Sequence, residues 1–284
     1  MQNYYTVASA KLATIEKLIE EAFKKMEMPH EMKIAELTQL QFARFCITLI
    51  LMLTPTVCSY AQQNLFNIPS GDITNHKKVF YQHQINVYGK KVESKSHFVY
   101  GLGKGWDAGV NLVGKGIYFT PQWRALYNDN TSNGSLYPIL MGTIQKQFML
   151  TKKIFVNIGG QYGWNLSNKI SNKKFNHFTY LLGRYNFLKG SRVVGGVYKT
   201  TNMFTGEGNT SGIIAGYEVK IAKRWYLMGD WVSGNNDAAV LVLGGMVNVS
   251  KRVQICSGWQ IPNPQTPKPK AIVLELNLLG WDLY

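Results

Sequence analysis

The residues with the chemistry to act on a solute are charged side chains in the C-terminal two thirds of the chain. Most of them lie in short runs that alternate between apolar and polar residues, a pattern typical of β-strands. Successive side chains of a strand point to opposite faces, so the alternation predicts one polar face that gathers these charges. The predicted set comprises Asp107, Arg184, Lys199, Glu218, Lys220, Asp230 and Glu275.

Part of this set follows an order of charge along the chain. Four successive runs carry the signs plus, plus, minus, minus, at Arg184, Lys199, Glu218 and Asp230. Charges that line a pore select solutes. They can equally pair with one another and close a narrow barrel. Both interpretations stay open, and in either case the polar lining is completed by Gln82, Gln84, Asn86, Asn111, Gln145 and Gln147.

A nucleophile and a base form the second candidate chemistry. The residues available are His83, Ser96, His97 and His177. His83 falls on the apolar face of its run, roughly opposite Ser96, and a Ser–His pair on an outer surface would suit a lipid hydrolase. A hydrolase also needs a third group to orient the base, and the chain shows no nucleophile motif. We therefore expect no enzyme, and with Glu93 as the only carboxylate near these histidines we expect no metal and no other cofactor.

The elements that must position these side chains are twelve predicted strands. Most match the 9–11 residues or so that a strand needs to cross a membrane. In 154–164, for example, Ile154, Val156 and Ile158 share one face and Asn157 and Gln161 the other. The spans are 78–88, 95–103, 105–120, 136–150, 153–165, 176–187, 191–202, 211–221, 224–233, 238–249, 252–262 and 270–280.

The connections between the predicted strands alternate in length. Short turns, each with a lysine, lie at 103–105, 151–153, 188–190, 222–224 and 250–252. Longer polar loops lie at 89–95, 121–135, 166–176, 203–211, 233–238 and 262–270. Short turns on one side and long loops on the other are typical of a transmembrane β-barrel. An even number of strands places both chain ends on the side of the short turns.

The N-terminal residues differ in composition from the rest. Residues 1–61 contain none of the 27 glycines and none of the seven tryptophans. Residues 1–31 have the apolar spacing of an amphipathic helix, and this extension is also consistent with a true start near Met32. Residues 32–61 read as a secretory signal, with a basic flank, an apolar run over 45–57 and small residues before a cleavage site after Ala61. Residues 62–77 are then expected to be a periplasmic lead-in to the barrel domain, 78–284.

The charge of the chain indicates its partners. The formal net charge of +15 belongs entirely to the residues after 61, because basic and acidic residues each number six before that point. No basic stripe with interleaved aromatic residues is present, so we expect no nucleic-acid partner. The positive residues lie largely in turns and loops, where they can face anionic lipid headgroups.

Aromatic residues lie where strands meet turns. Trp106 and Trp225 are near short turns, and Trp123 and Trp164 are near long loops. Aromatic girdles at both membrane interfaces account for this placement. A soluble β-sandwich also has alternating strands, but it accounts neither for tryptophans on exposed faces nor for the signal peptide together with one-sided turn lengths. The sequence thus predicts an all-β, antiparallel, up-and-down transmembrane barrel of about twelve strands.

A stretch of the chain resembles a known family. Residues 98–112, FVYGLGKGWDAGVNL, resemble the strand–turn–strand unit of Gram-negative outer-membrane barrels. They are similar in particular to the transporters grouped with the MetA pathway of phenol degradation. Tyr284 matches the aromatic last residue of such barrels, whereas Gly280 and Asp282 stand where apolar residues are usual. The resemblance implies an outer-membrane location, with outer-membrane lipids and the barrel-assembly machinery as partners.

These observations lead to an expected function. The leading expectation is a porin-like barrel that lets small polar or amphipathic solutes pass passively through a polar lumen. The alternative is a closed structural or adhesive barrel that acts through its long loops. A surface lipid hydrolase is the third hypothesis.

Overall fold

The computed structural model describes residues 64–166, 175–266 and 268–282. The predicted helical extension at 1–31 and the predicted signal peptide at 32–61 lie outside the described residues. In the part that is described, no helix has the length and apolarity to cross a membrane.

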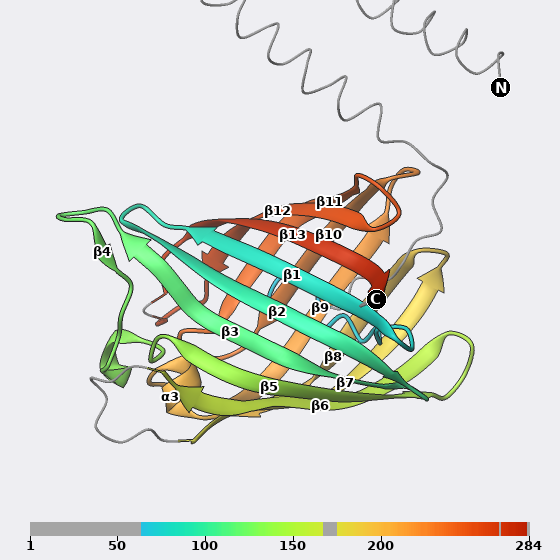
Figure 1. Ribbon diagram of the computed structural model, residues 1–284, viewed down its shortest axis with the longest axis horizontal. Helices are drawn as coiled ribbons and strands as arrows, with labels where there is room; N and C mark the ends of the chain where they lie inside the picture. Colours follow the sequence, from blue (N-terminus) through green and yellow to red (C-terminus); the bar gives the residue numbers. More distant parts are fainter. Residues whose placement is uncertain (1–63, 167–174, 267, 283–284) are drawn as a thin grey trace, which may run out of the picture. The chain divides into compact units, whose positions relative to one another are not determined.

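The described residues form a closed antiparallel β-barrel of twelve strands (Figure 1). Each strand pairs with its neighbours in the chain, and β1 pairs with β13 to close the ring. The strands of the ring are β1 (Lys78–Val87), β2 (Lys91–Gly103), β3 (Trp106–Tyr118), β5 (Ile139–Met149), β6 (Ile154–Asn165), β7 (Phe175–Leu188), β8 (Ser191–Thr200), β9 (Ser211–Lys220), β10 (Trp225–Val232), β11 (Val240–Asn248), β12 (Val253–Pro262) and β13 (Ala271–Asp282). The predicted fold class is confirmed.

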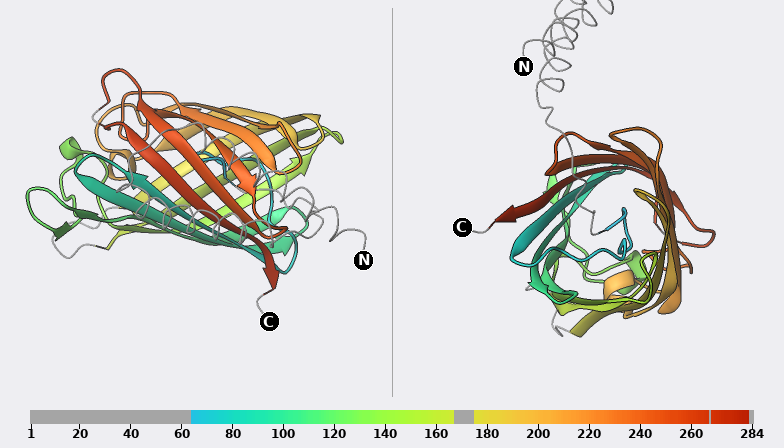
Figure 2. Two further views of the ribbon diagram at one scale, coloured as in Figure 1. Left: turned by 90° about the horizontal axis from the view of Figure 1, so that it is seen from above. Right: turned by 90° about the vertical axis from the view of Figure 1, so that its right-hand side faces the viewer.

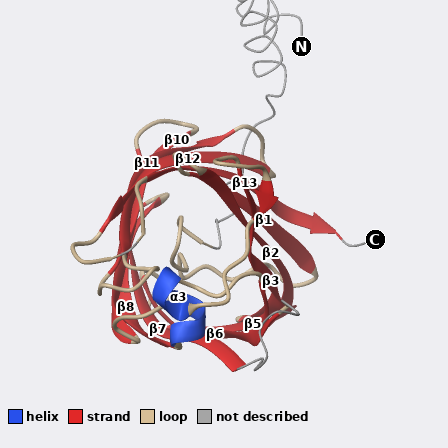
Figure 3. Ribbon diagram, turned by 90° about the vertical axis from the view of Figure 1, so that its left-hand side faces the viewer, coloured by secondary structure: helices blue, strands red, loops and turns tan. Residues whose placement is uncertain are grey.

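Three short elements lie in the longer connections. Strand β4 (Arg124–Ala125) pairs only with the end of β3. The 3-10 helix η2 (Thr131–Asn133) and the short helix α3 (Asn202–Thr205) lie in the connections before β5 and before β9. Helix α3 is seen at the long-loop end of the ring in Figure 3.

One predicted loop is wrong. Residues 89–95 were expected to be a long loop, but β2 already begins at Lys91 and pairs with β1 from Val87↔Val92 onward. The error has a physical cause, since polar residues lie on both faces of this stretch. Ser94 bonds the backbone of β3 on one face, and Lys95 reaches into the lumen on the other. A strand that is polar on both faces cannot be distinguished from a loop by alternation.

The outer face of the barrel is apolar over much of its area. On β6, Ile154, Ile158 and Trp164 are exposed, whereas Asn157 points inward and is fully buried. The predicted interfacial tryptophans Trp106, Trp123, Trp164 and Trp225 are 41%, 77%, 53% and 57% exposed.

The lumen is lined by both polar and apolar side chains. Strands β1 to β6 point amide side chains inward, as Gln82, Gln84, Asn111, Gln145 and Asn157 show. Strands β7 to β13 contribute most of an apolar cluster, whose buried members include Leu182, Val194, Ile214, Met228, Val242 and Val273. Because β12 and β13 also bury Gln254 and Asn277, polar side chains lie around the ring, and the expectation of a polar lining holds in part.

Candidate functional site

Residues 64–74, which we name the plug segment, lie inside the lumen (Figure 2, right). Leu65, Phe66 and Ile68 are fully buried there and belong to the apolar cluster of the lumen. Gly216 and Gly258 in the wall make room for them, because a Cβ atom at Gly216 would lie 2.4 Å from Leu65 Cδ1 and one at Gly258 2.8 Å from Phe66 Cζ.

The segment predicted as a periplasmic lead-in, 62–77, thus contributes residues 64–74 to the lumen, while Asn75 and His76 are exposed. The physical reason is the apolar character of its first part. Removing three large apolar side chains from water stabilises the segment by about 1.5–3 kcal/mol each, and the apolar cluster of the lumen buries them.

The middle of the plug segment is held from two sides of the ring. On β10, the Asp230 carboxylate accepts hydrogen bonds from the backbone N–H groups of Asn67 and Ile68, the latter at 3.0 Å. On β2, Lys95 Nζ donates to Phe66 O at 2.9 Å and to Asn67 Oδ1 at 3.2 Å. Charged groups on well-separated strands therefore bond the same short stretch of backbone.

A second set of contacts holds the plug segment near the short turns. The Asp72 carboxylate forms ion pairs with Arg184 on β7 and Arg192 on β8, and Arg192 also pairs with Glu218 on β9 at 2.7 Å. We name these four residues the arginine clamp. Arg184 also donates to Gly71 O at 2.9 Å. Pairing and hydrogen bonding of this kind offset the desolvation of buried charges.

Strands β3 and β5 add further hydrogen bonds to the same stretch, two from neutral amides and one to a carboxylate. Gln145 Nε2 donates to Asp72 O at 2.7 Å, and Gln147 Nε2 donates to Gly71 O at 2.5 Å. The Thr74 N–H donates to the Asp107 carboxylate at 3.1 Å.

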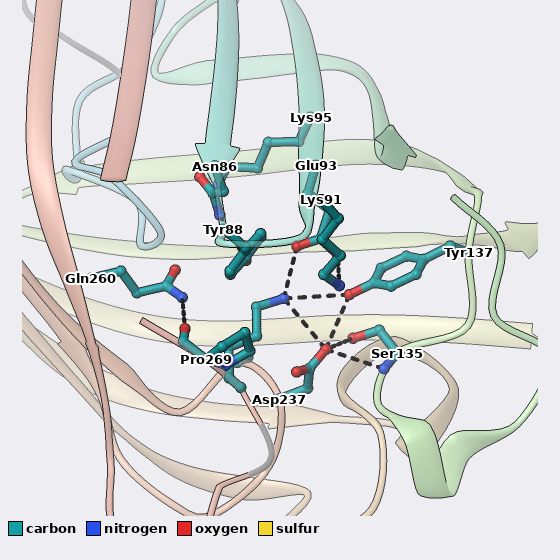
Figure 4. A network of polar contacts seen from close by, with 12 residues as sticks. Asn86, Tyr88, Lys91, Glu93, Lys95, Ser135, Tyr137, Asp237, Gln260 and Pro269 are labelled. Carbon is teal, nitrogen blue, oxygen red and sulfur yellow. Dashed lines mark hydrogen bonds and ion pairs between the residues drawn. The ribbon is translucent and has the colours of Figure 1, made fainter. Parts of the chain in front are cut away.

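The long-loop end of the lumen is held by a different ion network (Figure 4). Lys268 Nζ lies 3.0 Å from Glu93 Oε2 on β2 and 3.5 Å from Asp237 Oδ2 in the loop before β11. We name these three residues the lysine latch. Tyr137 and Ser135, in the connection before β5, donate their hydroxyl groups to the same oxygen of Asp237 at 3.0 and 3.1 Å.

Burial and neighbouring charges shift the pKa values of Lys268 and of two tyrosines beside the lysine latch. Burial alone would lower the pKa of Lys268, but the carboxylates of Asp237 and Glu93 outweigh burial and hold that pKa well above its ordinary value. Burial raises the pKa of Tyr137 well above its usual range, and the Asp237 charge adds to the shift. Burial likewise raises the pKa of Tyr88. At neutral pH the lysine is therefore charged and both phenols are protonated.

Two cavities adjoin the plug segment from opposite ends. One of about 140 Å³ lies on the long-loop side, between Asn67 and the lysine latch. The other, of about 1010 Å³, lies on the short-turn side next to Asp72 and Arg192. The larger one has a basic lining that includes Lys153, Lys189, Lys220 and Lys223.

The structure gathers most of the charged residues that the sequence singled out, but in another arrangement. Asp107, Arg184, Glu218, Asp230 and Glu275 are buried and point inward. Lys220 lies at the short-turn mouth and lines the larger cavity. Asp107, Arg184 and Asp230 contact the plug segment directly, and Glu218 acts through Arg192.

The prediction for Lys199 is wrong. Lys199 is exposed on the outer face, together with Val193 and Val197, while the alternate residues Arg192, Val194 and Tyr198 are buried in the lumen. The phase was misassigned because apolar residues lie on both faces of β8, with Val193 and Val197 outside and Val194 and Tyr198 inside, so alternation does not distinguish the faces. The ladder of Arg184, Lys199, Glu218 and Asp230 therefore does not form, and Arg192 supplies the second inward positive charge.

Sequence reasoning missed several residues of the site. These are Asp72, Glu93, Lys95, Arg192, Asp237 and Lys268. A signal existed for the plug segment, since Leu65, Phe66 and Ile68 form an apolar group just before the first strand. The lysine latch had no such signal, because its members are far apart in the chain.

The Ser–His candidates are partly brought together. His83 and Ser96 face each other on β1 and β2, and His83 Nδ1 lies 2.9 Å from Ser96 Oγ. His97 points inward, with Nδ1 2.8 Å from Asn64 Nδ2. The only further hydrogen bond that the described residues give His83 is a long one of 3.4 Å, with the Tyr81 hydroxyl. Within the described ranges, no group of three His, Cys, Asp or Glu side chains is placed to hold a metal ion.

Comparison with known proteins adds no relative, since no protein-family model matches the chain and no curated protein matches its sequence. The fold and the lumen alone define the class. It is a twelve-stranded antiparallel β-barrel whose lumen holds a segment of its own chain.

Proposed function

We propose that this protein is an outer-membrane β-barrel that passes small polar or amphipathic solutes when the plug segment is displaced. The observation that carries the proposal is the position of residues 64–74, which fill the lumen and are bonded to its wall on several sides. The exposed apolar outer face and the one-sided turn lengths support a place in a membrane. Passage is therefore gated and not permanently open.

The contacts of the plug segment support a gate more than a permanent core. Its backbone is held by side chains from β2, β3, β5, β7 and β10. Water can replace such hydrogen bonds, and the net contribution of each is about 0.5–1.5 kcal/mol for neutral pairs and about 1.5–3 kcal/mol where one group is charged. Cavities on both sides leave space into which side chains and solutes can move.

A closed structural barrel is the second candidate. The observation that favours it is the presence of a buried ion network at each end of the lumen. Removing one partner from such a network strongly destabilises the folded protein. In that case the long loops would carry the function.

A planar-bilayer recording separates these two candidates. The folded protein is expected to be silent. A double variant, Asp72→Asn with Asp230→Asn, removes two charged acceptors of the plug segment without changing side-chain size and is expected to give discrete conductance steps. The matched control is Asp129→Asn with Asp282→Asn, two exposed carboxylates, which should stay silent.

Each outcome of this recording decides between the candidates. Steady conductance of the unmodified protein would show that the plug segment leaves a path and would overturn the gate. Silence of the double variant, with insertion verified by heat-dependent gel mobility, would favour the closed barrel.

The hydrogen bond between His83 and Ser96 on the outer face keeps a surface lipid hydrolase as a third hypothesis. The pair lacks a carboxylate partner among the described residues, and the triad arrangement needs an orienting group. Hydrolysis of a short-chain phospholipid that is lost in both His83→Ala and Ser96→Ala would support the enzyme. Absence of hydrolysis by the unmodified protein, or equal rates in all three, would exclude this pair as its centre.

A further inference from the structure

The cavity of about 140 Å³ between the plug segment and the lysine latch is the feature that the gate does not itself explain. Its lining includes the apolar side chains of Phe178, Phe204, Val232 and Val240. It also includes the amides of Asn111, Gln161 and Gln260. A cavity lined by apolar side chains and a few amides suits a largely apolar molecule that carries a polar group.

The charges around this cavity balance within the protein. Two basic side chains, Lys95 and Lys268, and two acidic ones, Glu93 and Asp237, line it. Lys268 bonds both acidic groups (Figure 4). Lys95 bonds backbone and side-chain oxygens of the plug segment. A charged ligand would have to break one of these buried contacts without a replacement, which is costly. A neutral ligand avoids that cost.

One polar atom in the lining points to the group that the ligand must carry. Asn111 is buried and donates to Gln161 Oε1 at 2.7 Å, while its own Oδ1 has no hydrogen-bond partner among the described residues. Exchanging the two ends of the amide would leave the nitrogen unpaired instead. A hydroxyl group satisfies either arrangement, because it both donates and accepts.

The volume sets the size of the apolar part. An apolar cavity of about 150 Å³ holds a benzene molecule, so a cavity of about 140 Å³ matches a single six-membered ring. We infer that this cavity is a binding site for a neutral, single-ring-sized molecule with one hydroxyl group, which hydrogen-bonds Asn111 and packs against Phe178 and Val240. The inference rests on the proposed function, since it names the class of solute that the gate would admit.

The test uses cyclohexanol as the probe and the folded full-length protein in detergent, with binding followed by ligand-observed NMR. Asn111→Leu removes the polar anchor, and Val240→Phe fills the cavity. The control is Asn157→Leu, the same substitution at a buried asparagine that does not line the cavity and whose amide atoms also lack partners among the described residues. All proteins are compared at one detergent concentration, so that partition of the probe into micelles cancels.

We expect cyclohexanol to bind the unmodified protein and the Asn157→Leu control alike. It should bind Asn111→Leu and Val240→Phe about tenfold more weakly, the size of effect that an unpaired buried polar group or a lost cavity produces. Cyclohexane and cyclohexanecarboxylate should each bind the unmodified protein about tenfold more weakly than cyclohexanol.

Equal signals from all four proteins would show partition into micelles alone and would overturn the site. Tighter binding of cyclohexanecarboxylate would overturn the neutral class. The two proposals fail separately. Binding of cyclohexanol as expected in a barrel that never conducts would retain the site and reject the gate. Conductance of the plug-segment variants without cyclohexanol binding would do the reverse.

Discussion

The two ends of the lumen are held by ion networks of opposite design. In the arginine clamp, one carboxylate, Asp72, lies between two guanidinium groups. In the lysine latch, one ammonium group, Lys268, lies between two carboxylates. In both, the central charge comes from a segment that is not part of the wall. Removal of either central residue therefore leaves two like charges buried near each other.

The difference between the networks concerns what each one joins. The clamp fixes the plug segment to three adjacent wall strands, β7, β8 and β9, and uses the planar fork of arginine, which suits bidentate pairing with carboxylates. The latch joins β2 to two long loops and uses lysine, a point charge on a flexible stem. We expect the latch to open more easily than the clamp, so that a solute reaches the cavity before the plug segment moves.

The largest effect is expected from removing Asp72, the central charge of the arginine clamp. Asp72→Ala leaves Arg184 and Arg192 with Glu218 as their only carboxylate partner in the described part of the chain. Breaking a buried ion pair from one side costs about 3–5 kcal/mol, and we expect the upper end of that range here. The measurement is the free energy of unfolding in urea, together with thermolysin cleavage near Leu65 and Phe66, which should become fast.

The control for this prediction is Asp282→Ala, which removes an exposed carboxylate paired with Lys78. Its plug segment should stay resistant to thermolysin. Equal protection of Leu65 in Asp72→Ala and in the unmodified protein would show that the clamp does not retain the plug segment.

Removing the centre of the latch gives the next largest effect. Lys268→Met leaves Glu93 and Asp237 without their shared cation, and we expect a loss of about 3 kcal/mol in the free energy of unfolding. The variant should stay silent in planar bilayers because the plug segment is still held by the clamp. Lys270→Met, an exposed lysine of the same loop, is the matched control and should lose almost no stability. Conductance of Lys268→Met would show that the two ends are not independent.

The contrast between the ends also shows what the sequence could predict. The strands were predictable because their outer faces are apolar, as Ile154, Ile158 and Trp164 on β6 illustrate. Every ring strand except β2 begins and ends within a few residues of its predicted span. Asp230 and Arg184 were predictable as inward charges for the same reason, since they alternate with outward apolar residues.

The facing of β8, the plug segment and the lysine latch could not be predicted. One reason is that both polar and apolar side chains line the lumen. On β8 apolar residues lie on both faces, so the phase of Lys199 and Arg192 was reversed. The plug segment is placed by contacts with strands far along the chain, which no local pattern contains. The lysine latch depends on pairs such as Glu93 and Lys268, which only the closed ring brings together.

Alkaline pH should weaken the latch. The pKa values of Lys268, Tyr137 and Tyr88 are raised in the folded protein, so the folded state holds these protons more tightly than the unfolded state. Their contribution to stability is therefore full below the unfolded pKa values, near pH 10, and is lost as the pH rises above them. Glu93 and Asp237 face Lys268. We expect a loss of about 1 kcal/mol by pH 11.

The measurement is the free energy of unfolding from pH 7 to pH 11 for the unmodified protein and for Lys268→Met. The difference between the two curves reports Lys268 together with Tyr137 and Tyr88, whose pKa values the charge of Lys268 lowers. The difference should be constant to about pH 9 and shrink above pH 10. A difference that grows with pH would mean that Lys268 loses its proton more easily in the folded state.

The smallest expected effect is that of replacing Lys199, and it tests which basic residue of β8 faces the lumen. Lys199 and Arg192 are both basic residues of β8, but Lys199 lies on the outer face and Arg192 in the lumen. Lys199→Ala should change the free energy of unfolding by no more than about 0.5 kcal/mol, as is usual for exposed positions. It should leave thermolysin resistance and bilayer silence unchanged, whereas Arg192→Ala should lose both, because it removes a partner of Asp72. A conductance change in Lys199→Ala would place that side chain in the lumen and reverse the face of β8, and with it the membership of the clamp.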